Sequence, residues 1–98
     1  MNQLKLTACI EEVSGLRYTP AGLPALNLTL SHASQVQEAN VNRQVNLSMK
    51  AVAIGAIAET LVKQAIGSQW KFTGFLGTAL RGKSVVFHIQ EIAAAAQN

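Results

Sequence analysis

Residues 16–32 carry the sequence LRYTPAGLPALNLTLSH, in which a turn leads directly into an alternating strand. The turn is indicated by Thr19-Pro-Ala-Gly22, because proline fixes φ at one turn position and glycine tolerates a positive φ at another. Pro24 lacks an amide hydrogen and therefore suits the first residue of a strand. From Ala25 the leucines occupy every second position, which is typical of a strand with one buried face. We therefore predict a strand from about Ala25 to Ala33.

Working outward from this strand, the same alternation predicts four further strands. They cover residues 4–10, 43–50, 69–77 and 83–92. The polar segment 35–42 has no clear period, and we interpret it as a loop. The alanine-rich segment 93–98 is expected to be a loosely ordered tail.

One segment has a helical pattern instead. Its apolar residues form a stripe at helical spacing, and Gly67 is placed to end the helix; the stripe consists of Ile54, Ile57, Ala58, Leu61, Val62 and Ile66. The predicted order is three strands, one short helix and two strands. This order favours an all-β OB-fold, a five-stranded Greek-key barrel, as a single domain over residues 1–98. The pattern alone also fits another small barrel.

Length and composition indicate one small domain. The 98 residues, of which 49% are hydrophobic, are enough for one core, and the formal net charge of +3 moderately favours an anionic partner. With a single cysteine, Cys9, no internal disulfide is expected, which fits a reducing cytoplasm. We see no signal peptide, and the apolar-rich residues 51–66 are too short and too polar to span a bilayer. We therefore expect a cytoplasmic protein that does not contact a membrane.

The sequence argues against an enzyme. It contains no aspartate and only five scattered glutamates, whereas a two-metal nuclease site needs clustered carboxylates. Adjacent Glu11 and Glu12 are expected to point to opposite faces of a strand. His32 and His88 lie on different predicted strands and, with Cys9, fall short of a zinc site. No phosphate-binding or dinucleotide-binding motif is present, so we predict no catalytic residue, no metal and no other cofactor.

Several segments resemble the PriB family of primosomal replication proteins, which are small bacterial relatives of single-stranded DNA-binding protein. The matching segments cover nearly the whole chain in order and spacing: Leu16-Arg17, Thr19-Pro-Ala-Gly-Leu-Pro24, the Leu-x-Leu-x-Leu-x-His run ending at His32, Asn42-Arg-Gln44 and Thr73-Gly-Phe-Leu76. The resemblance implies an OB-fold homodimer that binds single-stranded DNA in replication restart. It also implies that the protein stabilises the PriA helicase on forked DNA and helps to recruit DnaT and the helicase loader.

Five basic residues fall on segments that line the oligonucleotide groove of an OB-fold. Arg17 lies in the loop after the first strand, and Arg43 and Lys50 bracket the third strand. Arg81 and Lys83 lie in the last hairpin. Any one of them is as well explained as a solubilising charge, but together they favour contact with phosphates, which need a basic track.

Aromatic residues are scarce on the predicted groove. Single-strand binders stack bases on aromatic side chains, yet the outward positions of the second and third strands hold none. An aromatic pair of better-known family members matches Val41 and Asn46 here. We count the outward-facing Asn46 and the loop residue Tyr18 among the expected DNA contacts. Trp70, Phe72 and Phe87 are assigned to the core, because alternating aromatics in strands usually pack inward. Phe75 has the opposite parity to Phe72, which is compatible with a place outside the core, in the groove or in a subunit interface.

Three functions are weighed on this basis. The first is a single-stranded DNA-binding module of the primosome. The second is a protein–protein adaptor of the primosome with weak or vestigial DNA binding, which the missing aromatics motivate. The third is an RNA binder of cold-shock type, which the same absence disfavours. We favour the first, with DNA binding that is electrostatic and weaker than in aromatic-rich relatives.

Overall fold

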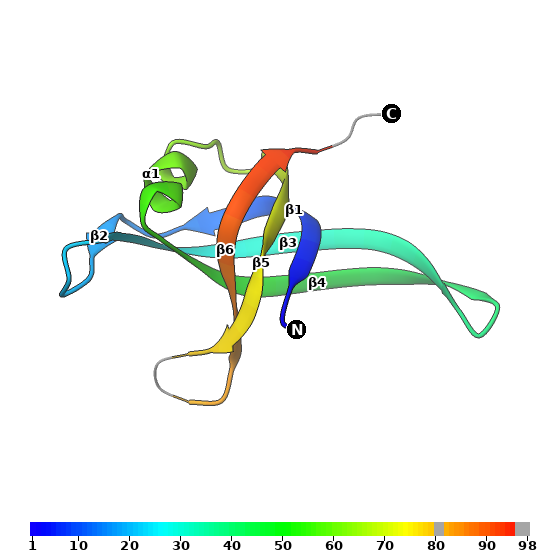
Figure 1. The fold of residues 1–98 in the computed structure, drawn as a ribbon. Coiled ribbons are helices and arrows are strands. Elements are labelled where there is room, and N and C mark those ends of the chain that lie inside the picture. Colours follow the sequence, from blue (N-terminus) through cyan, green and yellow to red (C-terminus); the bar gives the residue numbers. More distant parts are fainter. Residues whose placement is uncertain (80–81, 96–98) are drawn as a thin grey trace.

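The structure, a computed structural model, describes residues 1–79 and 82–95. It is a closed five-stranded barrel with one helix and one additional two-residue strand (Figure 1). In chain order the elements are β1 (Leu4–Val13), β2 (Arg17–Tyr18), β3 (Pro24–Glu38), β4 (Val41–Ile54), α1 (Ala56–Val62), β5 (Gln69–Thr78) and β6 (Val85–Ala94). The predicted order of three long strands, one short helix and two strands is confirmed.

The barrel follows the order β1-β5-β6-β4-β3, and β3 closes it by pairing with β1. The pairs of long strands are antiparallel except for β4 and β6, which run parallel. A parallel pair needs a crossover connection, and here the crossover contains α1 and β5. Strand β2 pairs with the first residues of β3, on the side of the barrel where α1 lies (Figure 1).

Alternate residues of the strands fill the barrel, as the sequence pattern predicts. Leu26, Leu28 and Leu30 of β3 are at most 3% exposed, and Ala58 and Leu61 of α1 join them. Burying a leucine or phenylalanine side chain stabilises the fold by about 1.5–3 kcal/mol. The aromatics assigned to the core are confirmed there, two of them fully buried and the third packed against the cluster: Phe72, Phe87 and Trp70. Among the described residues, no polar or charged side chain is buried.

The turn before β3 has the predicted geometry. The amide of Gly22 donates to the carbonyl oxygen of Thr19 at 2.8 Å, and Gly22 has a φ of 86°. The amide of Leu23 donates to the Thr19 hydroxyl at 3.1 Å. Strand β3 begins at Pro24. Because β2 is only two residues long, it shows no alternation, and the sequence pattern did not reveal it.

The prediction of a loop at residues 35–42 is wrong. Strand β3 continues to Glu38 and β4 begins at Val41, so the two strands form a long hairpin that projects beyond the barrel (Figure 1). Its turn residues, Ala39 and Asn40, have φ values of 52° and 63°, and a type I′ turn requires positive φ at both positions. The projecting part, residues 35–44, is called the arm here, and its residues are exposed on both faces. It therefore lacks the alternation that identifies a strand with one buried face.

Helix α1 is shorter than its predicted apolar stripe. Ile54 belongs to β4, where it pairs with Ala25, and Lys63 caps the helix directly after Val62. The side chain of Ile66 is 61% exposed.

At the C-terminal end of the chain, β6 runs through Ala94, so residues 93–94 of the expected tail pair with β5. The expected tail residues 96–98 lie outside the described residues.

Replacing Ala39 with asparagine should raise the free energy of unfolding by about 0.5–1 kcal/mol, because asparagine tolerates the left-handed region better than alanine does. Urea unfolding measures this difference. The control is Ala21→Asn, at an exposed turn position without a positive φ, where we expect a change within about 0.5 kcal/mol. An equal effect at both positions would contradict the assignment of strain to Ala39.

Candidate nucleic-acid interface

An open groove with a volume of about 1050 Å³ crosses the outer surface of the barrel. Its walls come from the end of β1, from β2, β3 and β4, and from the hairpin between β5 and β6. The charged side chains that line it are Glu11, Glu12, Arg17 and Lys50. Polar residues such as Asn27 and His88 and apolar residues such as Val52, Ile54, Ile66 and Val86 lie among them. Segments that are distant in sequence therefore share one surface, which we call the main groove.

Arg17 is positioned at the main groove by β2. It pairs with Ala25 of β3, and its guanidinium Nη2 donates to the side-chain oxygen of Asn27 at 3.2 Å. Asn27 is held in turn by Ser14, whose hydroxyl accepts from the Asn27 amide at 3.1 Å and whose amide donates to the Asn27 carbonyl at 2.9 Å. A guanidinium has five N–H donors, so the contact with Asn27 leaves other N–H groups that can donate hydrogen bonds to a phosphate.

Lys50 reaches the same groove from β4. It is paired with Thr29 of β3 and lies next to Ala51, which is buried in the barrel. Because side chains alternate along a strand, Lys50 points to the outer face. Arg17 and Lys50, separated by more than thirty positions in the sequence, are thereby brought to one groove.

The prediction that Glu11 and Glu12 point to opposite faces is wrong. The register shifts from Ile10, which pairs with Leu30, to Glu12, which pairs with Thr29, so Glu11 is the extra residue of a β-bulge. A bulge changes the alternation of a strand locally. As a result both carboxylates line the main groove, and Glu12 lies in the same cross-strand row as Thr29 and Lys50. These negative charges oppose the binding of a polyanion.

The other predicted contacts lie outside the main groove or at its edge. Tyr18 follows Arg17 in β2, and its side chain, 66% exposed, therefore points to the other face of that strand. Lys83 is exposed just before β6, next to the groove residue Ser84. Arg81 lies outside the described residues.

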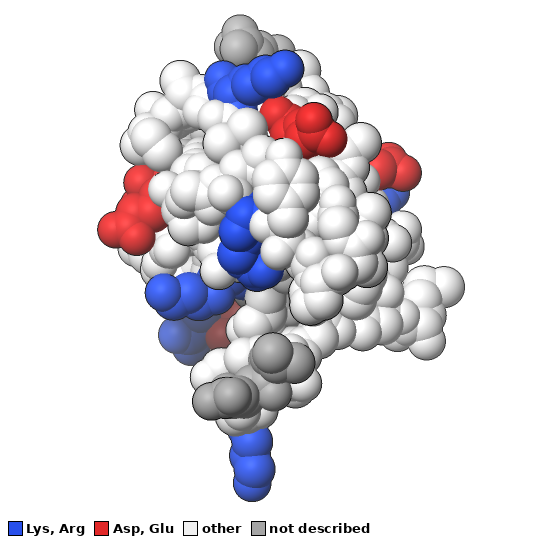
Figure 2. All heavy atoms as spheres, turned by 90° about the vertical axis from the view of Figure 1, so that its left-hand side faces the viewer, with Lys and Arg blue, Asp and Glu red and all other residues white. Residues whose placement is uncertain are grey.

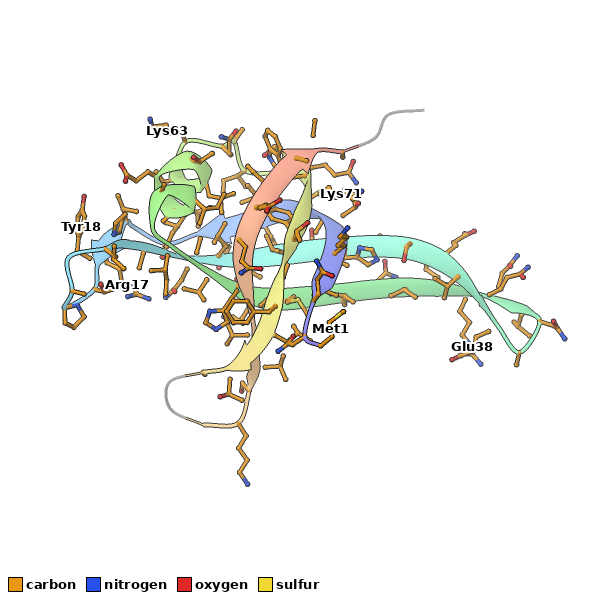
Figure 3. All side chains as sticks on the ribbon, in the orientation of Figure 1. Met1, Arg17, Tyr18, Glu38, Lys63 and Lys71 are labelled. Carbon is orange, nitrogen blue, oxygen red and sulfur yellow. The ribbon has the colours of Figure 1, made fainter. Side chains whose placement is uncertain are left out.

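Arg43 and Asn46 are both on the arm side of β4. Arg43 forms an ion pair with Glu38 of 2.6 Å between Nε and Oε1, and both side chains are more than half exposed. Such an exposed pair contributes little to stability. Asn46 lines a smaller groove of about 490 Å³ between β1, β3 and β4. Figure 3 places Arg17 and Glu38, the ion-pair partner of Arg43, at opposite ends of the molecule.

Charged side chains of both signs are mixed over the end of the molecule that carries β2. Figure 2 shows basic and acidic groups interspersed there, with no single continuous basic surface. The candidate interface is therefore defined by the position of a few cations at the main groove and not by a broad positive field.

In the part of the chain that the structure describes, the histidines are not arranged as metal ligands. No group of three histidine, cysteine or acidic side chains there is placed to hold a metal ion. His32 has a structural role, since its Nδ1 donates to the Thr7 carbonyl at 2.6 Å and its Nε2 accepts from the Ser34 hydroxyl at 2.8 Å. Within residues 1–79 and 82–95, no helix is long and apolar enough to cross a membrane.

Comparison with known proteins assigns the family. Residues 2–91 match a family described as another single-strand binding protein family. The replication restart protein PriB of Bordetella pertussis is 42% identical over 92 residues, which cover 93% of this chain and 86% of that protein. The chain belongs to the PriB family. The PriB of Nitrosomonas europaea is 34% identical over 91 residues, which cover 92% of this chain and 84% of that protein.

Solved structures confirm the OB-fold. A structure of PriB from Ralstonia solanacearum superposes with a TM-score of 0.88 at 38% identity, covering 98% of this chain and 99% of that one. The single-stranded DNA-binding protein of Thermus aquaticus superposes with a TM-score of 0.77 at 23% identity, covering 98% of this chain and 50% of that one, and shows the fold alone. The family is described as a single-strand binding family, and the relatives are named replication restart proteins and not enzymes, which agrees with the prediction that the protein is not an enzyme.

One aromatic feature of this PriB-family chain was not predicted. The rings of Phe75 and His88 are stacked, with centroids 4.7 Å apart and planes inclined by 7°. The opposite parity of Phe75 and Phe72 was the available signal, but it did not indicate a partner. His88 lines the main groove, so an aromatic pair lies at the interface although the outer faces of β3 and β4 have none.

Proposed function

We propose that this PriB-family protein binds single-stranded DNA in the main groove during replication restart. The observation that carries the proposal is the convergence of Arg17 and Lys50, from two different strands, on one groove of an OB-fold. OB-folds bind oligonucleotides along the strands and loops that supply these residues. The family match adds that the relatives are single-strand binding proteins.

In this proposal Arg17 and Lys50 contact phosphates of the bound strand, and Lys83 extends the track to the β5–β6 hairpin. Arg81 belongs to the same proposed track. A longer strand would continue along the arm past Asn46 toward Arg43, while Tyr18 would contact DNA outside the groove. Glu11 and Glu12 lie beside the cations in the main groove and weaken binding, so the complex dissociates more readily than it would without them.

We further propose that the protein acts as a cytoplasmic homodimer that stabilises PriA helicase on forked DNA and helps to recruit DnaT and the helicase loader. The name of the relatives, replication restart protein, supports a role in this process. No bond is made or broken by the protein itself. It acts by linkage, since binding DNA and helicase together strengthens both contacts.

The test is fluorescence anisotropy with labelled oligo(dT) and with a duplex of the same length over a series of salt concentrations. We expect tighter binding to the single strand and a linear fall of log K with log[salt], with a slope of about −0.7 for each phosphate neutralised. Absence of binding to either DNA at low salt would refute the proposal.

A primosome adaptor with vestigial DNA binding remains the second candidate. The acidic pair in the main groove favours it, because carboxylates repel phosphates. This candidate predicts that PriA binding survives neutralisation of the basic track, which consists of Arg17, Arg43, Lys50, Arg81 and Lys83. Measuring PriA binding with the same variants separates the two candidates.

A further inference from the structure

A row of side chains crosses the outer face of the barrel at the level of His88. In the strand register, Phe75 of β5 is opposite His88 of β6, His88 is next to Val52 of β4, and Val52 is opposite Asn27 of β3. Asn27 accepts the hydrogen bond from Arg17. Neighbouring strands are about 4.8 Å apart, so His88, two strands away, lies roughly 10 Å from Asn27.

All four residues of this row face outward, away from the core. Phe87 and Ile89, on either side of His88, are buried, and so are Ala51 and Ala53 on either side of Val52. Side chains alternate between the faces of a strand. The aromatic pair, the apolar Val52 and the cation at Asn27 therefore share one continuous surface, and all of it except Phe75 lines the main groove.

The His88 ring is held in place on this surface. Phe75 covers one face of the imidazole, with the planes inclined by only 7°. The edge of the ring lies close over Gly77, since a Cβ atom at that position would be 2.9 Å from Nε2 and 3.1 Å from Cδ2. Glycine thus leaves space for the ring, and a stacking group that is already fixed loses little conformational entropy when a ligand binds.

We propose that His88, supported by Phe75, is a stacking platform for a nucleobase of single-stranded DNA whose phosphates contact Arg17 and Lys50. The proposal rests on the proposed function and adds the recognition of bases to that of phosphates. Any base can stack on an aromatic ring, so the platform gives affinity without sequence preference. It also supplies, from β5 and β6, the aromatic contact that β3 and β4 lack.

The test compares oligo(dT) with an abasic oligonucleotide of the same length, by anisotropy at one low salt concentration. We expect His88→Ala to weaken binding of oligo(dT) by at least about fivefold and to leave binding of the abasic strand unchanged. His88→Phe keeps an aromatic ring and should retain the affinity for oligo(dT). Lys50→Ala should weaken both ligands, because it removes a phosphate contact.

His32→Gln is the matched control, because it replaces the other histidine, which has a structural role outside the main groove. With oligonucleotides short enough to occupy the main groove alone, it should leave both affinities unchanged. Ring-proton NMR signals of His88 in the unsubstituted protein provide a readout that does not depend on the folding of a variant. They should shift upfield on addition of oligo(dT) and much less with the abasic strand.

The outcomes distinguish the platform from the function on which it rests. If the unsubstituted protein binds neither strand, the proposed function fails and the platform fails with it. If it binds oligo(dT) but His88→Ala binds equally well, or loses both ligands to the same extent, only the platform is refuted. Loss of oligo(dT) binding in His88→Phe, or the absence of a base-dependent NMR shift, would also refute it.

Discussion

Replacing Gly74 with alanine is expected to lower the free energy of unfolding by about 2–4 kcal/mol. A Cβ atom at this position would overlap the carbonyl oxygen of His88 and lie 2.9 Å from Cε1 of Phe87. The first of these is backbone and the second belongs to a fully buried ring, so neither can move without disturbing the barrel. Strands β5 and β6 would have to separate where they pair.

The close approach at Gly74 has a local cause. The register of β5 and β6 shifts between Thr73, which pairs with Glu91, and Gly74, which pairs with Ile89. Glycine in a strand commonly marks such a bulge or a close approach of another backbone. The bulge precedes the Phe75–His88 pair, so Gly74→Ala should also disturb the wall of the main groove.

Thermal and urea unfolding test this prediction. For a domain of this length the expected loss corresponds to a decrease in Tm of roughly 10–25 °C. Gly15→Ala is the matched control, since a Cβ atom there would meet nothing within 4 Å and its φ is not positive. We expect that control to change stability by at most about 1 kcal/mol. Similar stability of the two variants would show that β5 and β6 tolerate the extra methyl group.

The barrel could be predicted from sequence because one face of each strand is buried there. The leucines of β3 and the aromatics of β5 and β6 stand at alternate positions, and burial imposes that alternation. The arm of β3 and β4 is a strand pair for a different reason. Its hydrogen bonds and its two-residue turn hold it together, and a hairpin exposed on both faces leaves no apolar period in the sequence.

The candidate site was less accessible to sequence reasoning than the fold. Arg17 and Lys50 were predicted from the resemblance to a family and an OB-fold, and the structure brings them to one groove. The bulge at Glu11 was not predictable, because one extra residue in a strand leaves no signal in a single sequence. The pairing of Phe75 with His88 depends on the register of β5 and β6, which the alternation of either strand alone does not specify.

The double variant Arg17→Ala/Lys50→Ala should lose roughly 50-fold in affinity for oligo(dT) at 50 mM salt. Each cation that neutralises a phosphate contributes about 0.7 to the slope of log K against log[salt] for single strands. Removing two should therefore flatten the slope by about 1.4. Extrapolated from 1 M salt, where this contribution vanishes, to 50 mM, that change in slope corresponds to nearly two decades in K.

The double variant Lys5→Ala/Lys63→Ala removes the same net charge from residues that do not line the main groove. It should keep most of the affinity and nearly the full slope, because neither lysine lines the main groove and the slope counts only the phosphates that are neutralised there. Glu12→Gln removes a charge of the opposite sign from the cross-strand row of Lys50 and should strengthen binding. Equal losses in the two double variants would mean that the affinity for DNA depends only on the overall charge of the protein. The assignment of the DNA-binding site to the main groove would then be wrong. A selective loss in Arg17→Ala/Lys50→Ala, with an affinity gain in Glu12→Gln, would instead place the phosphates in the main groove, which these three residues line.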